Sequence, residues 1–251
     1  MAIGMAGVVK TGILGLDAML NGGIPEKNQI VLAGGPGAGK TLLSFEFLYR
    51  NAKQGNNSVM FVVEEDAEKV LENAKGAFSG LKDIDDLVKS GALSIEGLSA
   101  VSNASESMRQ SSYEFGNFVS DIEAIIADKK ATRVVIDSTA VLEILVKDPL
   151  MFRKSMLALV VDLRRLGVTS ILTAEMSSLE KQSLSFRPEF FLFDGIIMLY
   201  LSGEEEKRMQ SMEIIKMRGS KHSFVTTPYD ISPARLVVLN RIVHVDNGRA
   251  Y

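Results

Sequence analysis

The sequence predicts an α/β fold, in which a mostly parallel central sheet is flanked by helices and extended by antiparallel strands near the carboxyl end. Three observations lead to this prediction. Strand-like and helix-like segments alternate along most of the chain. Several strand-like segments are continuous apolar runs, which is typical of strands covered on both faces. From Arg208 onward, short strand-like runs separated by turn residues replace the alternation.

The individual elements follow from the same patterns. Apolar runs predict strands of the parallel sheet at residues 29–33, 58–63, 93–96, 133–136, 170–174 and 195–201. Helical spacing of apolar residues predicts helices at residues 41–53, 67–78, 107–128 and 151–166. In the third helix, the face expected to pack on the core carries Phe118, Ile122, Ile125 and Ile126. The antiparallel strands are expected at residues 212–217, 223–229, 236–239 and 242–245.

Length and composition bound the possible architectures. The chain has 251 residues, of which 46% are hydrophobic, enough for a substantial core. It has no internal repeat or long linker, so we predict a single domain spanning residues 1–251. The absence of cysteine excludes disulfides, thiolate metal sites and cysteine nucleophiles. The histidines are His222 and His244 alone, which argues against a histidine-rich metal centre.

Charge and hydropathy bear on partners and location. The net charge of −3 gives no global basic field, which argues against strong non-specific nucleic-acid binding and leaves room for a local basic loop. No apolar run approaches the roughly 20 residues that span a bilayer. The amino terminus lacks the basic start of a signal peptide. We therefore expect a cytoplasmic protein with no membrane partner.

The most informative segment is residues 34–41, which read Gly-Gly-Pro-Gly-Ala-Gly-Lys-Thr and fit the P-loop pattern G-x-x-x-x-G-K-[ST]. A predicted strand precedes the segment and a predicted helix follows it, which is the setting this motif requires. Lys40 is expected to reach the β- and γ-phosphates, and the Thr41 hydroxyl to bind Mg²⁺. The predicted nucleotide-binding residues are Gly35, Pro36, Gly37, Ala38, Gly39, Lys40, Thr41 and Leu42.

Acidic residues end several predicted strands. Asp137 ends the strand at residues 133–136 and is expected to hold Mg²⁺ through its water shell, although it could simply cap a turn. Glu64 and Glu65 end the next strand after the P-loop helix, and Glu175 ends another. Because strand carboxyl ends face the ligand crevice of a parallel sheet, at least one of the paired glutamates should lie near the γ-phosphate. An exposed loop charge pair is the alternative.

Two cations lie near the other end of the chain. Lys216 and Arg218 alternate around Met217, so on a strand they would share one face. Such a pair can meet a phosphate, an acidic cluster or solvent. Composition alone favours a solvated edge strand.

Together these segments resemble the KaiC-like branch of the RecA/RadA ATPase superfamily. The resemblance covers nearly the whole chain, from about residue 9 to residue 240. Within that branch the chain resembles the single-domain prokaryotic, archaeal type, whereas the clock protein of the branch has two such domains in tandem. The double glutamate combined with Lys-Met-Arg-Gly-x-x-His is the most specific part. In chain order, the matching segments are residues 10–17, 22–25, 34–41, 64–65, 137–138, 193–197 and 216–222.

The resemblance implies a RecA-like P-loop NTPase core that binds ATP with Mg²⁺ and hydrolyses it. It implies a homo-oligomer, commonly a hexameric ring, with ATP between neighbouring subunits. Glu64 and Glu65 would be the catalytic carboxylates, and Lys216 and Arg218 would reach the γ-phosphate of ATP held by the adjacent subunit. The residues that would approach this ATP in trans are Lys216, Met217, Arg218 and His222.

Three functions remain open on the sequence. The first is an ATPase whose hydrolysis drives a switch in a homo-oligomeric ring. The second is a recombinase paralogue that binds single-stranded DNA through loops at residues 139–154 and 176–188. The third is a nucleotide-sensing signalling protein with slow hydrolysis. The basic residues of the two loops are Lys147, Arg153, Lys154, Lys181 and Arg187.

Overall fold

The computed structural model describes residues 7–63, 65–98, 115–176, 187–203, 208–232 and 235–239. A nine-stranded sheet runs through these residues in the order β11-β10-β9-β8-β3-β7-β6-β4-β5. This architecture confirms the predicted α/β class, with a mostly parallel sheet that is extended by antiparallel strands near the carboxyl end. The strands are β3 (Gln29–Gly34), β4 (Ser58–Val62), β5 (Leu93–Gly97), β6 (Arg133–Asp137), β7 (Thr169–Glu175), β8 (Gly195–Ser202), β9 (Met209–Met217), β10 (Thr227–Ser232) and β11 (Arg235–Val238).

The sheet has a parallel part and an antiparallel part. Strands β3 to β8 pair in parallel with one another, whereas β8–β9, β9–β10 and β10–β11 pair antiparallel. Every residue of β3 and β4 is buried, which accounts for their continuous apolar sequences. The change from parallel to antiparallel pairing at β9 confirms the change of pattern predicted after Arg208.

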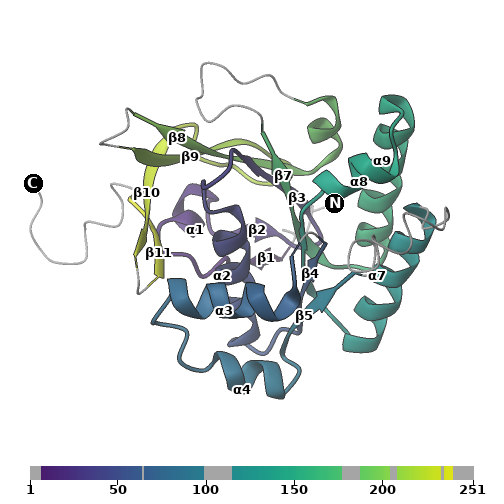
Figure 1. The fold of residues 1–251 in the computed structure, drawn as a ribbon. Helices are drawn as coiled ribbons and strands as arrows, with labels where there is room; N and C mark the ends of the chain where they lie inside the picture. Colours follow the sequence, from purple (N-terminus) through teal and green to yellow (C-terminus); the bar gives the residue numbers. More distant parts are fainter. Residues whose placement is uncertain are drawn as a thin grey trace, which may run out of the picture.

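Helices cover both faces of the parallel part (Figure 1). One face carries α2 (Lys40–Ala52), α3 (Ala67–Ala77) and α4 (Ile84–Lys89). The other face carries α7 (Phe115–Lys129), α8 (Ala140–Leu145) and α9 (Pro149–Arg165). The remaining short elements are β1 (Val8–Val9), α1 (Leu16–Met19), β2 (Ile24–Pro25) and the 3₁₀ turn η2 (Pro188–Leu192). None of the helices in the described part of the chain is long and apolar enough to cross a membrane.

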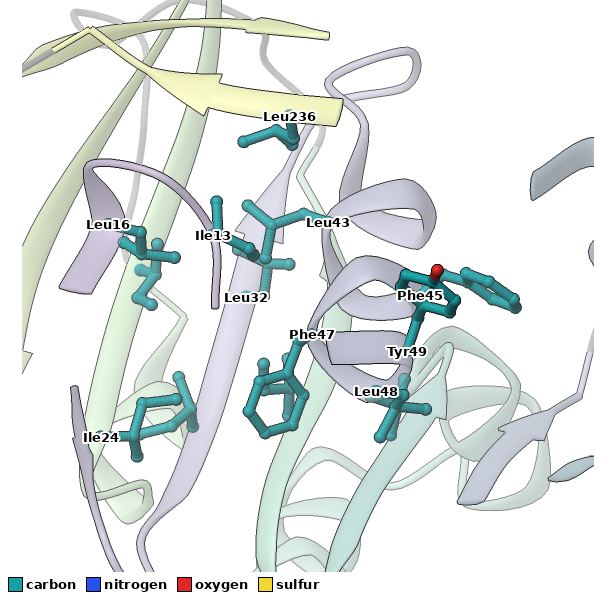
Figure 2. Close-up of a cluster of buried hydrophobic side chains, with 14 of the residues drawn as sticks. Ile13, Leu16, Ile24, Leu32, Leu43, Phe45, Phe47, Leu48, Tyr49 and Leu236 are labelled. Atoms are coloured by element: carbon teal, nitrogen blue, oxygen red, sulfur yellow. The ribbon is translucent and has the colours of Figure 1, made fainter. Parts of the chain in front are cut away.

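The helix after the P-loop is buried on nearly all sides. In Figure 2, Leu43 of α2 lies near Ile13 and Leu236, while Phe45 and Phe47 point in different directions from the same helix. All five of these side chains are buried. A helix that is buried over most of its surface must pack against several elements, here β4, β6, α3 and β11. This packing fixes α2, and with it the loop that precedes it.

Some elements differ from their predicted bounds. The strand predicted at residues 223–229 begins at Thr227, because the Ser223 N–H donates to the Met19 carbonyl (2.8 Å) and so binds the preceding segment to α1 instead of to β9. The helix predicted at residues 107–128 is described from Phe115 onward. Residues 107–114, and the strand predicted at residues 242–245, lie outside the described residues.

The segment at residues 139–154 is helical where a loop was expected. It contains α8 and the first turn of α9. Asp148 caps α9 by accepting a hydrogen bond from the Met151 N–H (2.8 Å), and Pro149 occupies the first turn. This Asp-Pro start is a helix signal that can be read from sequence. The prediction of a loop between two strands did not take this signal into account.

Candidate functional site

The loop between β3 and α2 has a backbone that only glycine adopts easily. Gly37 and Gly39 have φ angles of 75° and 84°. A Cβ added to Gly39 would lie 2.4 Å from Cδ1 of Ile231, so that side chain would have to shift to admit a larger residue. No side chain caps α2 at Gly39, which leaves the first backbone N–H groups of the helix available. A helix start of this kind is an anion site.

Lys40 adds a cation to the same place. Its ammonium donates to the carbonyls of Gly34 (3.0 Å) and Gly35 (3.1 Å), so the side chain lies along the loop. The positive end of the α2 dipole and this ammonium both favour a negatively charged ligand. The loop and Lys40 together suit a chain of phosphates.

A hydroxyl and a carboxylate meet beside the loop. The Thr41 Oγ1 donates to Asp137 Oδ2 at 2.6 Å, and the Thr173 hydroxyl donates to the other oxygen of the carboxylate. Hard oxygen atoms of this kind suit Mg²⁺, which prefers one or two protein oxygens together with water and phosphate. The described residues contain no group of three or more His, Cys, Asp or Glu side chains that could hold a metal by themselves. The site therefore fits a cation that arrives with its phosphates.

These residues line one cleft at the carboxyl end of the parallel sheet. Its volume is about 420 Å³. Glu65 and Glu175 are exposed and stand at its edge, and Glu175 is next to the P-loop because it pairs with Gly34. Glu64 lies outside the described residues. The cleft is lined by Pro36, Gly37, Gly39, Lys40, Thr41, Leu42, Val62, Glu65, Val70, Asp137, Ser138, Glu175 and Ile231.

Strand β10 supports the P-loop from behind. The Tyr229 hydroxyl donates a hydrogen bond to the Ala38 carbonyl, and Tyr229 is only 4% exposed. Burial raises the pKa of this phenol, so it remains a donor. Ile231, two residues further along β10, lines the cleft. Neither role could be predicted from the sequence, because one tyrosine in an alternating strand is typical of an ordinary core position.

The antiparallel hairpin is joined to the P-loop helix by a buried carboxylate. Glu46 of α2 is 1% exposed. One of its oxygens accepts from the Leu236 N–H of β11 (2.7 Å), and the other accepts from the Arg50 guanidinium (2.8 and 3.1 Å). The carboxylate is therefore fully hydrogen-bonded although it lies in the core. It holds β10 and β11 against the helix that begins at the P-loop.

Lys216 and Arg218 lie at the opposite end of the sheet from the cleft. Lys216 pairs with Ile196 at the start of β8, and the Arg218 N–H donates to the Asp194 carbonyl (2.8 Å). This is the amino end of β3 as well, since Ile30 pairs with Gly195. β3 has six residues, and at ~3.3 Å per residue its two ends are roughly 16 Å apart. The two cations are thus remote from the P-loop of their own chain.

The side chains of both cations are held at that end. The Lys216 ammonium donates to the Phe191 carbonyl (3.2 Å) and to the Phe193 carbonyl. Nη1 of Arg218 lies 3.4 Å from Oδ1 of Asp194. Asp194 also accepts two hydrogen bonds from Arg164, at 2.9 and 3.1 Å. The predicted solvated face is therefore a charged cluster around one carboxylate.

Met217 and His222 occupy two further places. Met217 is buried, and its side chain packs beside Gly195 in the core. His222 has its Nδ1 at 3.1 Å from the Ser223 carbonyl, and its ring centre is 4.6 Å from that of Phe224. It lines a separate open cleft of about 890 Å³. Neither side chain touches the P-loop cleft of its own chain, and their predicted contact with nucleotide stays a prediction.

The basic residues expected to meet DNA are only partly described, since residues 177–186 lie outside the described part of the chain. Arg187 forms ion pairs with Glu143 and Glu189. Its guanidinium also lies 5.9 Å from the ring centre of Phe152. A cation countered by two carboxylates adds little to a surface that attracts phosphates.

Comparison with known proteins agrees with this geometry. The chain matches the family described as "ATPase: KaiC" over residues 9–242. It is 34% identical to the UPF0273 protein MK0039 of Methanopyrus kandleri, over 89% of this chain and 88% of that protein. It is 28% identical to the circadian clock protein KaiC3 of Synechocystis sp., over 92% of this chain and 45% of KaiC3. The solved KaiC-like protein PH0186 of the archaeon Pyrococcus horikoshii aligns with a TM-score of 0.75 and 28% identity, over 94% of this chain and 100% of that one.

The matched residues run from the last residue of β1 to beyond β11, so they include the P-loop, Asp137 and the Lys216–Arg218 segment. Both the fold and the cleft residues lie within the match. The chain therefore belongs to the KaiC-like ATPases of the RecA type.

Proposed function

We propose that this protein is a Mg²⁺-dependent ATP hydrolase that works in the cytoplasm as a homo-oligomeric ring of six subunits, with ATP between neighbouring subunits. One observation carries the proposal. The P-loop amides, Lys40, the Thr41–Asp137 pair and Glu65 converge on a single cleft at the carboxyl end of the parallel sheet. That combination can bind a triphosphate, hold its cation and orient water.

Each group has a distinct part in this chemistry. The amides at the start of α2 and the Lys40 ammonium bind the phosphate oxygens. Thr41 and Asp137 would hold Mg²⁺, which when bound neutralises charge on the phosphates. Glu65, together with Glu64, accepts a hydrogen bond from the attacking water and then its proton, so that hydroxide attacks in line and ADP leaves.

The position of Lys216 and Arg218 supports a role in trans. Because both lie roughly 16 Å from the P-loop of their own chain, a contact with a γ-phosphate requires a second subunit. There they would stabilise charge on the transferring phosphoryl group, with the Met217 main chain and His222 alongside. A ring satisfies this geometry at every interface.

The test combines ATP turnover with light-scattering mass, measured with and without single-stranded DNA. We expect Mg²⁺-dependent turnover by an oligomer. Arg218→Ala should reduce kcat by about 10³-fold or more while nucleotide still binds, and Lys40→Ala should abolish binding. Normal turnover in Arg218→Ala would contradict the trans role.

No described observation favours the DNA-binding alternative, because Arg187 is paired and the segment at residues 139–154 is helical. A salt-dependent gel shift with single-stranded DNA would reinstate it. Slow turnover combined with nucleotide-dependent capture of a partner would instead favour the signalling function.

A further inference from the structure

The main chain of Arg218 is held on both sides. Its N–H donates to the Asp194 carbonyl at 2.8 Å, and its carbonyl accepts from the Asn28 side-chain amide at 2.9 Å. Gly219 follows with a φ angle of 81°, where the chain turns away from the sheet. The backbone position of Arg218 is therefore fixed by residues outside its own strand.

The Arg218 side chain is held much more loosely than its backbone. It is 55% exposed, and its guanidinium reaches Oδ1 of Asp194 and the Phe191 carbonyl only at 3.4 Å each. The Asp194 carboxylate is also hydrogen-bonded by both Arg164 contacts and by the Gln29 N–H (3.1 Å). Since these contacts compensate the buried carboxylate, the guanidinium of Arg218 can leave it without stranding a charge. A fixed backbone with a releasable side chain suits a group that must reach outward.

Asn28 and Asp194, which hold the Arg218 main chain, also lie at the start of the strand that carries the P-loop. Asn28 directly precedes β3, and the Asp194 N–H donates to the Gln29 carbonyl (2.8 Å). β3 then ends at Gly34, where the P-loop begins. One buried strand thus joins the phosphate-binding loop of a subunit to the anchor of the arginine that this subunit presents to its neighbour.

We infer that Asn28 and Asp194 are positioning residues that aim Arg218 at the nucleotide of the adjacent subunit. The inference rests on the proposed trans ATPase function and deepens it. Without the Asn28 amide, the Arg218 carbonyl loses its donor and the backbone can shift. Without the Asp194 carboxylate, Arg164 and Arg218 repel one another with nothing between them.

The first test measures steady-state turnover and nucleotide affinity of single variants. Asn28→Ala should lower kcat by about 10-fold to 100-fold, the cost of a misplacement near 1 Å, while KM for Mg·ATP changes by less than about twofold. Asn57→Ala is the matched control, because the Asn57 amide also donates one 2.9 Å hydrogen bond to a distant carbonyl, that of Lys129. The control should keep the turnover of the parent protein.

A mixing experiment separates positioning from a folding defect. Lys40→Ala subunits lack a working P-loop but keep Arg218 and its anchors. Co-expressed as neighbours, they should restore turnover at the sites of Asn28→Ala and Asp194→Asn subunits. A defect inside the variant's own site would not be restored. Unrestored turnover in Asn28→Ala, or normal kcat in that variant alone, overturns the inference.

The Arg218→Ala variant distinguishes failure of the positioning role of Asn28 and Asp194 from failure of the proposed trans role of Arg218. If Arg218→Ala loses turnover and Lys40→Ala neighbours restore it, the trans role holds. Normal kcat in Asn28→Ala would then remove only the positioning role. If Arg218→Ala keeps normal turnover, or is not restored by the same neighbours, the trans role itself fails.

Discussion

The hydroxyl of Tyr229 donates a hydrogen bond to the main-chain carbonyl of Ala38, and so joins the antiparallel hairpin to the centre of the P-loop. The two residues are 191 positions apart in the chain. The contact orients the peptide whose neighbours supply the phosphate-binding amides. Strand β10 therefore belongs to the nucleotide site although it carries no charged group into the cleft.

Replacing Tyr229 with Phe should weaken nucleotide binding. The ring stays in place, but the Ala38 carbonyl loses its donor at a net cost of about 0.5–1.5 kcal/mol, which corresponds to a rise in Kd of about two- to tenfold. Isothermal titration with Mg·ATP measures it.

Tyr200→Phe is the matched control for this change. Tyr200 is also buried, and its hydroxyl donates to Glu213 (3.1 Å) on the neighbouring strand, but it does not line the cleft. Equal weakening in both variants would mean that the loss reflects general stability and not the contact with Ala38.

Asp137→Asn should raise the Mg²⁺ concentration required for turnover and lower kcat by about 100-fold or more. The amide keeps an oxygen for the Thr41 or Thr173 hydroxyl, so the fold should persist. Turnover against Mg²⁺ concentration is the measurement. Thr173→Val, which removes only a supporting hydroxyl, should give a smaller loss of about 10-fold. A larger loss in Thr173→Val than in Asp137→Asn would contradict the assignment.

Glu46→Ala should destabilise the fold by about 2–4 kcal/mol, because it strands the buried Leu236 N–H and leaves Arg50 without its partner. Urea unfolding followed by circular dichroism measures this loss. Arg50→Ala provides the comparison, since it leaves the Glu46–Leu236 bond intact but leaves the carboxylate without its counter-charge. Unchanged stability in Glu46→Ala would show that the packing of the hairpin on α2 does not depend on the hydrogen bonds of Glu46.

The charge on Lys216 should make stability depend on alkaline pH. Burial, followed by the neighbouring Arg218 charge, lowers the pKa of Lys216 from its usual value of 10.5. The protonated form therefore costs the folded state below the lowered pKa, and this cost disappears as the pH rises from there to 10.5. The parent protein should gain stability relative to Lys216→Met across that window, in urea unfolding at a series of pH values. A constant difference in stability between the two proteins across that window would contradict the prediction.

The sequence was sufficient to predict the elements whose apolar residues follow a simple pattern. Buried strands such as β3 and β4 read as continuous apolar runs, and each ended close to the predicted residue. The P-loop was predicted from its G-x-x-x-x-G-K-[ST] pattern. Asp137 was predicted because the carboxyl ends of parallel strands meet at one edge of the sheet. The single-domain division and the catalytic role of Glu64 and Glu65 stay predictions.

Other features depend on contacts between distant segments and left no local signal. Tyr229 and Glu46 are single polar residues in apolar surroundings, and only the packing of β10 and β11 against α2 shows what they bind. The short elements α1 and α4 were missed because helices of four and six residues show too little periodicity. Composition predicted a solvated face for Lys216 and Arg218, since their partners are distant in sequence: the carbonyls of Phe191 and Phe193 for Lys216, and the Asp194 carboxylate for Arg218.

The placement of β3 has a consequence for how the protein is made. Both neighbours of β3 in the sheet, β7 and β8, are encoded far downstream of it. The residues of β3 therefore leave the ribosome long before those of β7 and β8 have been synthesised. During that time the apolar side chains of β3 lack the strands against which they pack. Until synthesis has passed Glu175, the nascent chain has a phosphate-binding sequence but neither of the strands that pair with β3.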